Sequence, residues 1–170
     1  ARSTPAPGTK GAPASRAMVD VGVLGEVAGE LLATPYSAGI VVTLATDVQF
    51  SLPATLADVY GVLIPAQERE HIAAVGIETN KQRGHGGAGH LLNLMFCHLS
   101  ADRFMQSAND VVVGLGIRSV EWLMPSLSRH VLHSRVFRWP CAEPISWVGR
   151  ARALHRYRTL QAADPSRIVL

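Results

Sequence analysis

The chain has 170 residues, of which 48% are hydrophobic and 17% charged, with a formal net charge of +3. This length fits one domain with a hydrophobic core, and the apolar content excludes a disordered chain. No apolar run reaches the ~18 residues of a membrane span, and no charged-then-apolar leader precedes the first residues. We therefore expect a cytoplasmic protein, or one associated with a membrane surface.

The positive charge is concentrated near the C-terminus. Residues 129–158 hold seven arginines against one acid, Glu143, a net charge of +6, whereas residues 1–128 hold eight basic against eleven acidic residues, a net charge of −3. Two interpretations stay open: a surface for phosphate, carboxylate or lipid headgroups, or an ordinary solvated helix face. Nucleic-acid binding is disfavoured, since three tryptophans and one basic block meet its requirements only loosely.

The first part of the chain reads as a linker, a helix and a strand. Residues 1–18 are rich in Pro, Gly, Ala and Ser, which is typical of a flexible segment or linker. The helical spacing of apolar residues predicts a helix over 19–32, which Pro35 ends. The β-branched run over 37–46 predicts a strand buried on both faces.

Three further segments of strand type surround a glycine-rich stretch. The segments 60–64 and 71–78 predict two strands with a hairpin-like connection, and 90–97 predicts another buried strand with Asn93 as its only polar interruption. The glycine-rich stretch 81–89 lacks the lysine and the helix start of a phosphate-binding loop. We interpret it as a hairpin loop.

The remaining elements complete an α+β pattern. Ser100 predicts the N-cap of a short helix over 101–107, and apolar spacing predicts a second helix over 110–124. A strand over 131–139 and a helix over 149–161 follow, and residues 167–170 resemble the start of another strand. The sum is a mixed, largely antiparallel sheet of about five strands with three to four helices.

Residues that could carry catalysis or bind metal form no convincing group. Cys97 and Cys141 are the only cysteines, so neither a disulfide framework nor a zinc site is indicated. His130 and His133 have helical spacing, but His133 falls in a predicted strand. Cys97 and His98 are neighbours on a strand end and point to opposite faces, which argues against a catalytic pair.

The stretch 131–154 combines aromatic, proline and arginine residues. Trp139 and Trp147 offer flat surfaces, and Pro140 and Pro144 stiffen the segment between them. Such a rigid corner could face a flat or anionic ligand, or it could be an ordinary turn between a strand and a helix. Composition leaves both interpretations open.

A series of short motifs adds a family resemblance. The motifs occur in the order Pro35-Tyr36-Ser37, Tyr60-Gly61-Val62-Leu63-Ile64-Pro65, Ala73-Ala74-Val75-Gly76-Ile77-Glu78, Val136-Phe137-Arg138-Trp139-Pro140-x-Ala142-x-Pro144 and Val148-Gly149-Arg150. In this order they resemble the substrate-binding part of flavin-containing amine oxidoreductases, the group that includes protoporphyrinogen oxidase-like and phytoene desaturase-like enzymes. The resemblance extends over roughly residues 34–170.

The resemblance implies a substrate-binding domain over residues 19–170, serving FAD-dependent dehydrogenation of a hydrophobic small molecule. It implies that Trp139 and Pro144 line the wall facing the flavin, with Arg138 and Glu143 as polar partners. It makes Tyr36 and Tyr60 secondary candidates for the substrate pocket. A purely structural role is the alternative for each of these six residues.

The family's FAD-binding parts have no counterpart in the sequence. They are an N-terminal glycine-rich dinucleotide fold and a C-terminal Gly-Asp segment. We therefore expect the chain to be truncated before a C-terminal FAD-binding segment, to bind no FAD alone and to be inactive alone. The missing segments, or a partner chain, would supply the cofactor. The alternatives are a stand-alone binding module whose basic C-terminal face holds an anionic lipid or an acidic protein, and a non-functional remnant.

Overall fold

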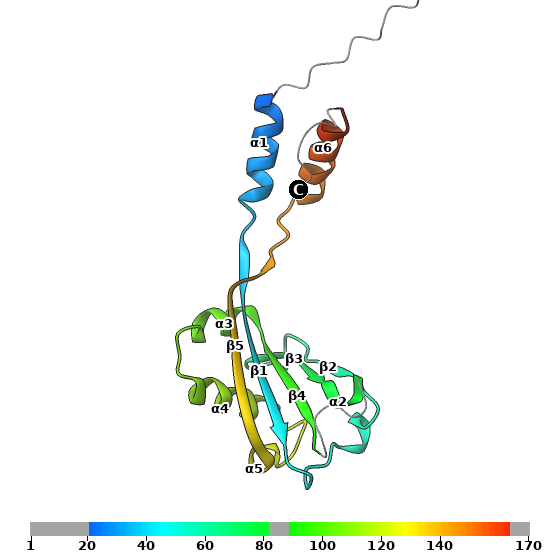
Figure 1. Ribbon diagram of the computed structural model, residues 1–170, viewed down its shortest axis with the longest axis vertical. Helices are drawn as coiled ribbons and strands as arrows, with labels where there is room; N and C mark the ends of the chain where they lie inside the picture. The colour runs from blue at the N-terminus through cyan, green and yellow to red at the C-terminus, as the bar shows by residue number, and fades with distance from the viewer. Residues whose placement is uncertain (1–20, 82–88, 164–170) are drawn as a thin grey trace, which may run out of the picture. The chain divides into compact units, whose positions relative to one another are not determined.

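A computed structural model describes residues 21–81 and 89–163, with the side chains of 21–24 excepted. The predicted linker over 1–18, most of the glycine-rich stretch 81–89 and the predicted strand over 167–170 lie outside the described residues. The chain divides into two compact units, one formed by residues 35–145 and the other by the segments on either side. The predicted domain over 19–170 spans both units (Figure 1).

The larger unit is built on a five-stranded sheet with the order β2-β3-β4-β1-β5. All four pairings between these described strands are antiparallel. The strands are β1 (Tyr36–Thr46), β2 (Gly61–Leu63), β3 (Ile72–Ile77), β4 (Leu91–Phe96) and β5 (Val131–Pro144). The predicted α+β class and the largely antiparallel sheet of about five strands are confirmed.

The central strand β1 alternates between a buried and a half-buried side. Its even-numbered residues from Ala38 to Thr46 are buried, and the odd-numbered residues between them are only partly covered. The prediction that this strand is buried on both faces is therefore wrong. Because successive side chains of a strand point to opposite faces, one face of the sheet is a core face and the other is open.

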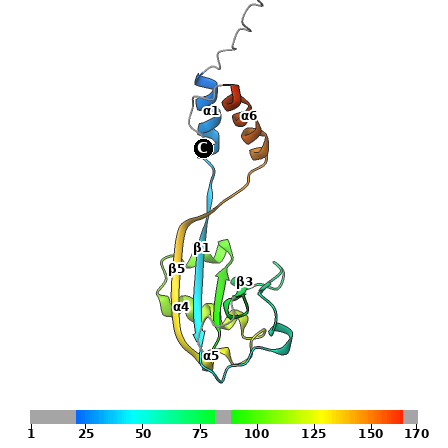
Figure 2. The same cartoon turned by 45° about the vertical axis from the view of Figure 1, so that its right-hand side comes forward.

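Helices cover the core face. They are α3 (His98–Phe104), α4 (Asn109–Val120) and the short α5 (Leu127–His130). Their buried residues, such as Val112, Val120 and Leu127, join one hydrophobic cluster with Ile40 and Leu94 from the sheet. Figures 1 and 2 show these helices gathered on one side of the strands. Two further segments, the 3-10 turn η1 (Ala54–Leu56) and α2 (Glu78–Lys81), connect strands.

Gly116 explains how α4 approaches the sheet closely. A Cβ atom at this position would lie 3.2 Å from Leu94 Cδ1 and 3.5 Å from a ring carbon of Phe96. Both neighbours belong to the core face of β4. The glycine that weakens the helix by its low propensity therefore lets the helix backbone lie against the strand.

The structure corrects the predicted start of the first helix in this unit. The helix α3 begins at His98 with Cys97 as its N-cap, and no side-chain capping bond is formed. Ser100 instead lies in the first turn, where its hydroxyl contacts His71 Nδ1 at 3.1 Å and Cys97 Sγ at 3.4 Å. The Ala101 amide donates to the Cys97 carbonyl at 2.8 Å, which is the first backbone hydrogen bond of the helix.

The predicted proline corner is part of a long edge strand. β5 continues to Pro144, five residues beyond the predicted end at Trp139, and it pairs with β1 along most of its length. Pro140 lacks an amide donor, but an edge strand offers one side on which no ladder bond is required. Register shifts in the β1–β5 pairing accompany this extension. The segment is a strand and not a turn.

The smaller unit consists of two helices. The helices α1 (Val21–Leu32) and α6 (Arg150–Ala163) run antiparallel to each other (Figure 1). Val27 and Tyr157 are buried between them, with partly buried Leu31 and Leu160 alongside. Gly149 has a φ of +101° just before α6, a conformation that favours glycine. Both helices match their predicted ranges closely. No described helix combines the length and apolar content that crossing a bilayer requires.

Candidate functional site

The open face of the sheet carries a groove with a volume of about 830 Å³. Its lining is largely apolar and comes from all five strands and the connections beside them. The residues that line it are Ser37, Ala38, Gly39, Ile40, Val41, Leu63, Arg69, Ala73, Ala74, Met95, Phe96, Cys97, His98, Trp139, Ala142, Glu143 and Ile145. A few polar groups in a mostly apolar concavity are typical of a small-molecule site.

The floor of the groove follows from the strand register. Residues directly opposite each other on neighbouring strands share a face, so one apolar row crosses the open side of the sheet. This row consists of Leu63, Ala74, Met95 and Val41, which line the groove, and continues to Phe137 beside it. Leu63 is 83% exposed and Met95 37% exposed. The row is therefore an accessible apolar strip and not part of the core.

Aromatic and cationic side chains stack along β5 at one side of this strip. The rings of Phe137 and Trp139 lie 6.1 Å apart and 16° from parallel, and the Arg135 guanidinium lies 4.9 Å from the Phe137 ring centre. Opposite Trp139 stands Gly39, where a Cβ would lie 2.8 Å from Ala142 Cβ. Glycine at this position gives the two strands room to approach and leaves the Trp139 ring accessible.

A polar network occupies the next row of the open face. Asn93 accepts a hydrogen bond from Thr43 Oγ1 at 2.6 Å and donates one to Glu78 Oε1 at 3.0 Å, and Lys81 Nζ donates to the same Glu78 oxygen at 2.6 Å. A Cβ at Gly76 would lie 2.7 Å from that oxygen. The asparagine that interrupts the predicted buried strand is thus the centre of a surface network.

Two of the six predicted site residues line the groove together. They are Trp139, which is 44% exposed, and Glu143. Arg138 points to the opposite face: it stands in register with buried Ile40 and donates to Asn109 Oδ1 at 2.7 Å and to the Ser107 carbonyl at 2.8 Å. Arg138 therefore holds the connection between α3 and α4 against the sheet. It lies on the other face from Trp139, beside which it was predicted.

The other three predicted residues lie outside the set that lines the groove. Pro144 and Tyr36 are register neighbours at the far end of the β1–β5 ladder, and both are exposed. Tyr60 is exposed before β2, where its carbonyl accepts the Ile77 amide at 2.9 Å. The structure therefore brings Tyr36 and Pro144 together and leaves Tyr60 apart.

Several groove residues were not found from the sequence. Met95, Leu63 and Ala74 are ordinary strand residues whose place on the open face depends on pairing with distant strands. Arg69 lies in the connection between β2 and β3, which the sequence marks only as a polar turn. One signal was available: strand alternation places Arg138 and Trp139 on opposite faces.

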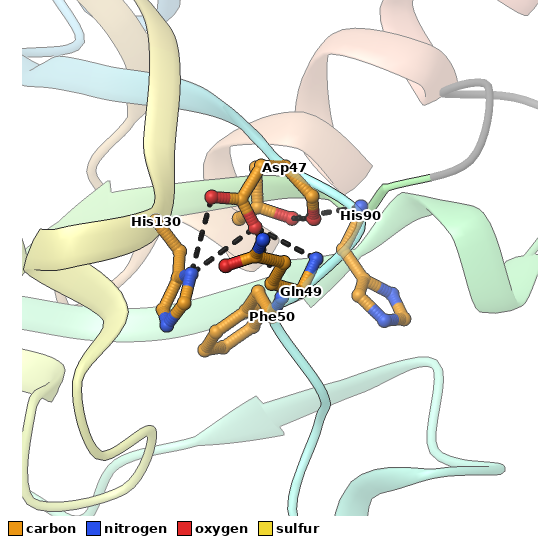
Figure 3. Close-up of polar contacts among 6 residues, drawn as sticks. Asp47, Gln49, Phe50, His90 and His130 are labelled. Atoms are coloured by element: carbon orange, nitrogen blue, oxygen red, sulfur yellow. Dashed lines mark hydrogen bonds and ion pairs between the residues drawn. The ribbon is translucent and has the colours of Figure 1, made fainter.

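A second polar cluster lies at the end of the sheet where β1 stops (Figure 3). Asp47 accepts hydrogen bonds from the amides of Gln49 and Phe50 at 2.8 and 3.0 Å, and His130 Nδ1 lies 3.1 and 3.2 Å from its two carboxylate oxygens. The Phe50 ring packs against His130 and, edge-on, against His90. The cluster ties the end of β1 to the starts of β4 and β5.

This environment shifts the acidity of two groups. Burial raises the pKa of Asp47, but the contacts from His130 and the two amides outweigh it and hold the pKa below its ordinary value. Burial lowers the pKa of His90 because it disfavours the charged imidazolium. No group of three or more His, Cys, Asp or Glu residues in the described part of the chain could hold a metal ion.

The described residues do not form the unit that holds the FAD diphosphate in dinucleotide-binding folds. Dinucleotide folds hold it at a helix N-terminus after the first strand of a parallel β-α-β unit. All strand pairs described here are antiparallel, so such a unit does not occur among them. The groove offers an apolar strip and an indole ring, which suit a flat organic molecule better than a diphosphate.

Comparison with known proteins finds similarity in structure and none in sequence. No protein-family model matches the chain, and no curated protein matches it significantly in sequence. A provisionally assigned protoporphyrinogen oxidase from Exiguobacterium sp. 255-15 matches in structure with a TM-score of 0.63 at 19% identity, over 81% of this chain and 30% of that protein. Reduced UDP-galactopyranose mutase matches with a TM-score of 0.58 at 12% identity, over 81% of this chain and 28% of the mutase.

These matches concern the fold alone. The chain spans less than a third of either protein. An oxidoreductase from Methanosarcina mazei has a TM-score of 0.44 at 17% identity, which is too low to argue from. The predicted resemblance is confirmed at the level of the fold: the chain shares its fold with part of a provisionally assigned protoporphyrinogen oxidase and with part of UDP-galactopyranose mutase.

Proposed function

We propose that this chain is the substrate-binding portion of an FAD-dependent oxidoreductase of the amine oxidase and protoporphyrinogen oxidase type, acting on a hydrophobic small molecule. The observation that carries the proposal is the apolar groove on the open sheet face, in a fold shared with a provisionally assigned protoporphyrinogen oxidase from Exiguobacterium. The chain would position the substrate and exclude water from one side of it. The redox chemistry would come from FAD held by segments outside the described residues or by a partner chain.

The contacts of the groove support this division of labour. Met95, Val41 and Leu63 present an accessible apolar floor, and the Trp139 indole provides a flat wall at its edge. A hydrophobic substrate laid on this floor would lose contact with water on one face. Glu143 is a polar group at the same edge that could orient a donor of the substrate.

A charge placed in the floor tests whether the groove binds apolar molecules. Met95→Arg should abolish saturable binding of the neutral dye Nile red to the full chain, because the guanidinium would occupy the strip and carry its water with it. The matched control is Val111→Arg, which adds the same charge at a 47% exposed apolar residue on α4. Fluorescence titration measures both, and equal binding by the two variants would contradict the proposed site.

The cofactor part of the proposal needs its own measurement. We expect the purified chain to retain no flavin absorbance after gel filtration, because the antiparallel sheet offers no dinucleotide-binding unit. A chain that stays yellow would show that it holds FAD by itself. The groove would then remain a candidate, but the proposed division between two segments or chains would fail.

A second candidate function is a binding module for an anionic lipid surface or an acidic protein. Arg152, Arg156 and Arg158 are exposed on α6, and this observation favours it. Pelleting with vesicles containing anionic lipid should then fall as salt rises, because exposed charges are screened. Pelleting that depends neither on the salt concentration nor on the lipid charge would exclude this mode of binding. Arg138, counted in the same basic block, is already engaged by Asn109 and Ser107.

A further inference from the structure

A thiol lies at the groove where β4 ends. Cys97 follows the last residue of this strand and lines the groove together with Phe96 and His98. It is partly exposed, whereas Cys141, the other cysteine of the chain, is exposed on β5 and lies outside the groove lining. The Cys97 amide donates to the His71 carbonyl at 2.8 Å, which holds the thiol beside the start of β3. The chain therefore presents two thiols in different surroundings.

A buried hydroxyl connects the groove thiol to an imidazole. The Cys97 thiol donates to Ser100 Oγ at 3.4 Å, and Ser100 Oγ lies 3.1 Å from His71 Nδ1. Ser100 is only 7% exposed, so its hydroxyl has little access to competing water. Because a hydroxyl carries a single proton, the hydroxyl that accepts from the thiol donates its own proton to the imidazole. The hydrogen bonds therefore lead from the sulfur to His71.

His71 is held in one orientation and faces a carboxylate. Its ring lies 6.5 Å from the Phe96 ring and 9° from parallel, and it meets the Phe104 ring edge-on at 5.3 Å. On its other side, Nε2 lies 3.7 Å from Glu70 Oε1. A neutral imidazole that accepts from Ser100 at Nδ1 carries its proton on Nε2, toward Glu70. The side chains are thus arranged as a nucleophile, a base and a group that orients the base, with a hydroxyl between the first two.

We propose that Cys97 is a covalent capture site for an apolar electrophile of the α,β-unsaturated carbonyl class that binds in the groove. The sulfur forms a bond to the β-carbon, and the π electrons of the carbon–carbon double bond move to give an enolate. The thiol proton passes to Ser100 as the proton of Ser100 passes to His71. Water then protonates the α-carbon, and the hydroxide so formed takes the proton from the His71 imidazolium. The addition needs no oxidant or reductant.

The groove makes this thiol selective for an apolar electrophile. Met95 lies two residues before Cys97 on the chain and belongs to the apolar strip, so a molecule lying on the strip is held next to the sulfur. Holding the two reactants together makes their reaction effectively unimolecular. Cys141 lies outside the lining, so the same electrophile meets it only from solution. This inference goes beyond the proposed function, because it requires the groove but no flavin.

Two maleimides with the same reactive group test the capture site on the full chain. N-(1-pyrenyl)maleimide carries a flat apolar body, and N-ethylmaleimide carries a small one. Peptide mapping by mass spectrometry gives the rate at each cysteine, and Cys141 is the reference thiol within the same molecule. The ratio of the rate at Cys97 to the rate at Cys141 should be about 10-fold or more higher for the pyrenyl reagent, because the groove concentrates it. An excess of Nile red should slow the pyrenyl reagent at Cys97 and not at Cys141.

Variants of the hydroxyl and the imidazole test the proton transfer. Ser100→Ala should slow both maleimides at Cys97 by about 100-fold, the lower end of what general-base catalysis contributes. Ser100→Thr keeps a hydroxyl and should retain much of the wild-type rate. His71→Phe keeps the ring packing and should slow the reaction as Ser100→Ala does, and the double variant should be no slower than either. The rate at Cys141 should stay unchanged in all of them.

Each part of the proposal can fail separately. A wild-type rate at Cys97 in Ser100→Ala and His71→Phe would overturn the proton transfer through these two residues. Equal ratios for the two maleimides, or no protection by Nile red, would rule out capture from the groove. If Cys97 stays unlabelled while Nile red binds, the covalent site fails and the proposed function stands. If Nile red binds equally to Met95→Arg and Val111→Arg, the proposed function fails by its own test. Thermal unfolding of each variant verifies that it is folded.

Discussion

At the scale of single residues, one carboxylate organises the end of the sheet. Asp47 accepts two backbone amides and faces His130, so it links the turn after β1 to the residue that precedes β5. Its ionised form is the better acceptor for all of these donors, which is why its pKa lies below the ordinary value in spite of partial burial. The cluster therefore couples the stability of the sheet unit to pH.

We predict that acid destabilises the folded chain through this residue. Because the pKa of Asp47 is lower in the folded than in the unfolded state, the unfolded chain takes up the proton more readily. The contribution of Asp47 is complete above pH 3.8, the ordinary value, and is lost as pH falls through the folded pKa. Urea unfolding across this window should show a shallower acid dependence for Asp47→Asn than for wild type. An exposed control, Asp58→Asn, should keep the wild-type slope.

His90 affects stability in a separate pH window that lies higher than that of Asp47. Its pKa is below 6.5 in the folded state, so the unfolded chain gains the proton first as pH falls through 6.5. This also lowers stability on acidification, but from nearer neutral pH. The two effects are separable because they fall in different pH windows, one near 3.8 and below and the other near 6.5 and below.

At the scale of elements, glycines decide how closely the backbone segments approach one another. Gly89 leads into β4, and a Cβ there would lie 2.0 Å from the Thr46 carbonyl oxygen. Gly114 in α4 is different, because a Cβ there would meet only Arg118 Nη1, at 3.2 Å. A long side-chain tip can move, whereas the backbone of β1 cannot. The close approach of two backbone segments therefore requires glycine at position 89, whereas nothing in the packing requires it at position 114.

Alanine substitution should change the stability of the chain in opposite directions at these two glycines. Gly89→Ala should destabilise the chain by about 2 kcal/mol or more, because the new methyl overlaps the Thr46 backbone. Gly114→Ala should stabilise it by up to ~1 kcal/mol through helix propensity. Chemical denaturation of both variants measures the difference. A neutral Gly89→Ala would show that β4 can enter the sheet without this close approach.

At the scale of the whole molecule, the described residues contain two separate hydrophobic clusters. One lies between the sheet and its helices, and the other, around Val27 and Tyr157, lies between α1 and α6. The second is small, with only a few partly buried side chains around it. A helix pair with so little buried apolar surface opens more easily than a sheet with a covered face.

We predict that core substitutions act within their own unit. Val27→Ala should cost about 1.5–3 kcal/mol of local stability and speed amide hydrogen exchange in α1 and α6, with little change in β1 and β4. Met124→Ala, in the larger cluster, should cost about 2–5 kcal/mol and speed exchange in the sheet unit. Exchange measured by mass spectrometry resolves the two patterns. Uniform acceleration across both units by Val27→Ala would contradict this separation.

The sequence by itself determined the elements and the fold class. Apolar periodicity is encoded within about ten neighbouring residues, so the strand over 37–46, the helices at 19–32 and 149–161 and the antiparallel sheet were all predictable. Trp139 and Glu143, which the sequence offered through the family resemblance, are both among the residues that line the groove. The proline corner was misread because a strand edge that tolerates proline looks like a turn in sequence.

Only the tertiary structure decided which residues form the groove. Ser37 Oγ reaches the Glu143 carbonyl, 106 positions away, and the open face exists because β1, β4 and β5 align in a particular register. A shift of one residue would move every side chain of a strand to the other face. That register separates Arg138 from Trp139 and places Arg69, three strand spacings from β5, on the same groove. Pairing between distant segments carries this information, and local periodicity does not.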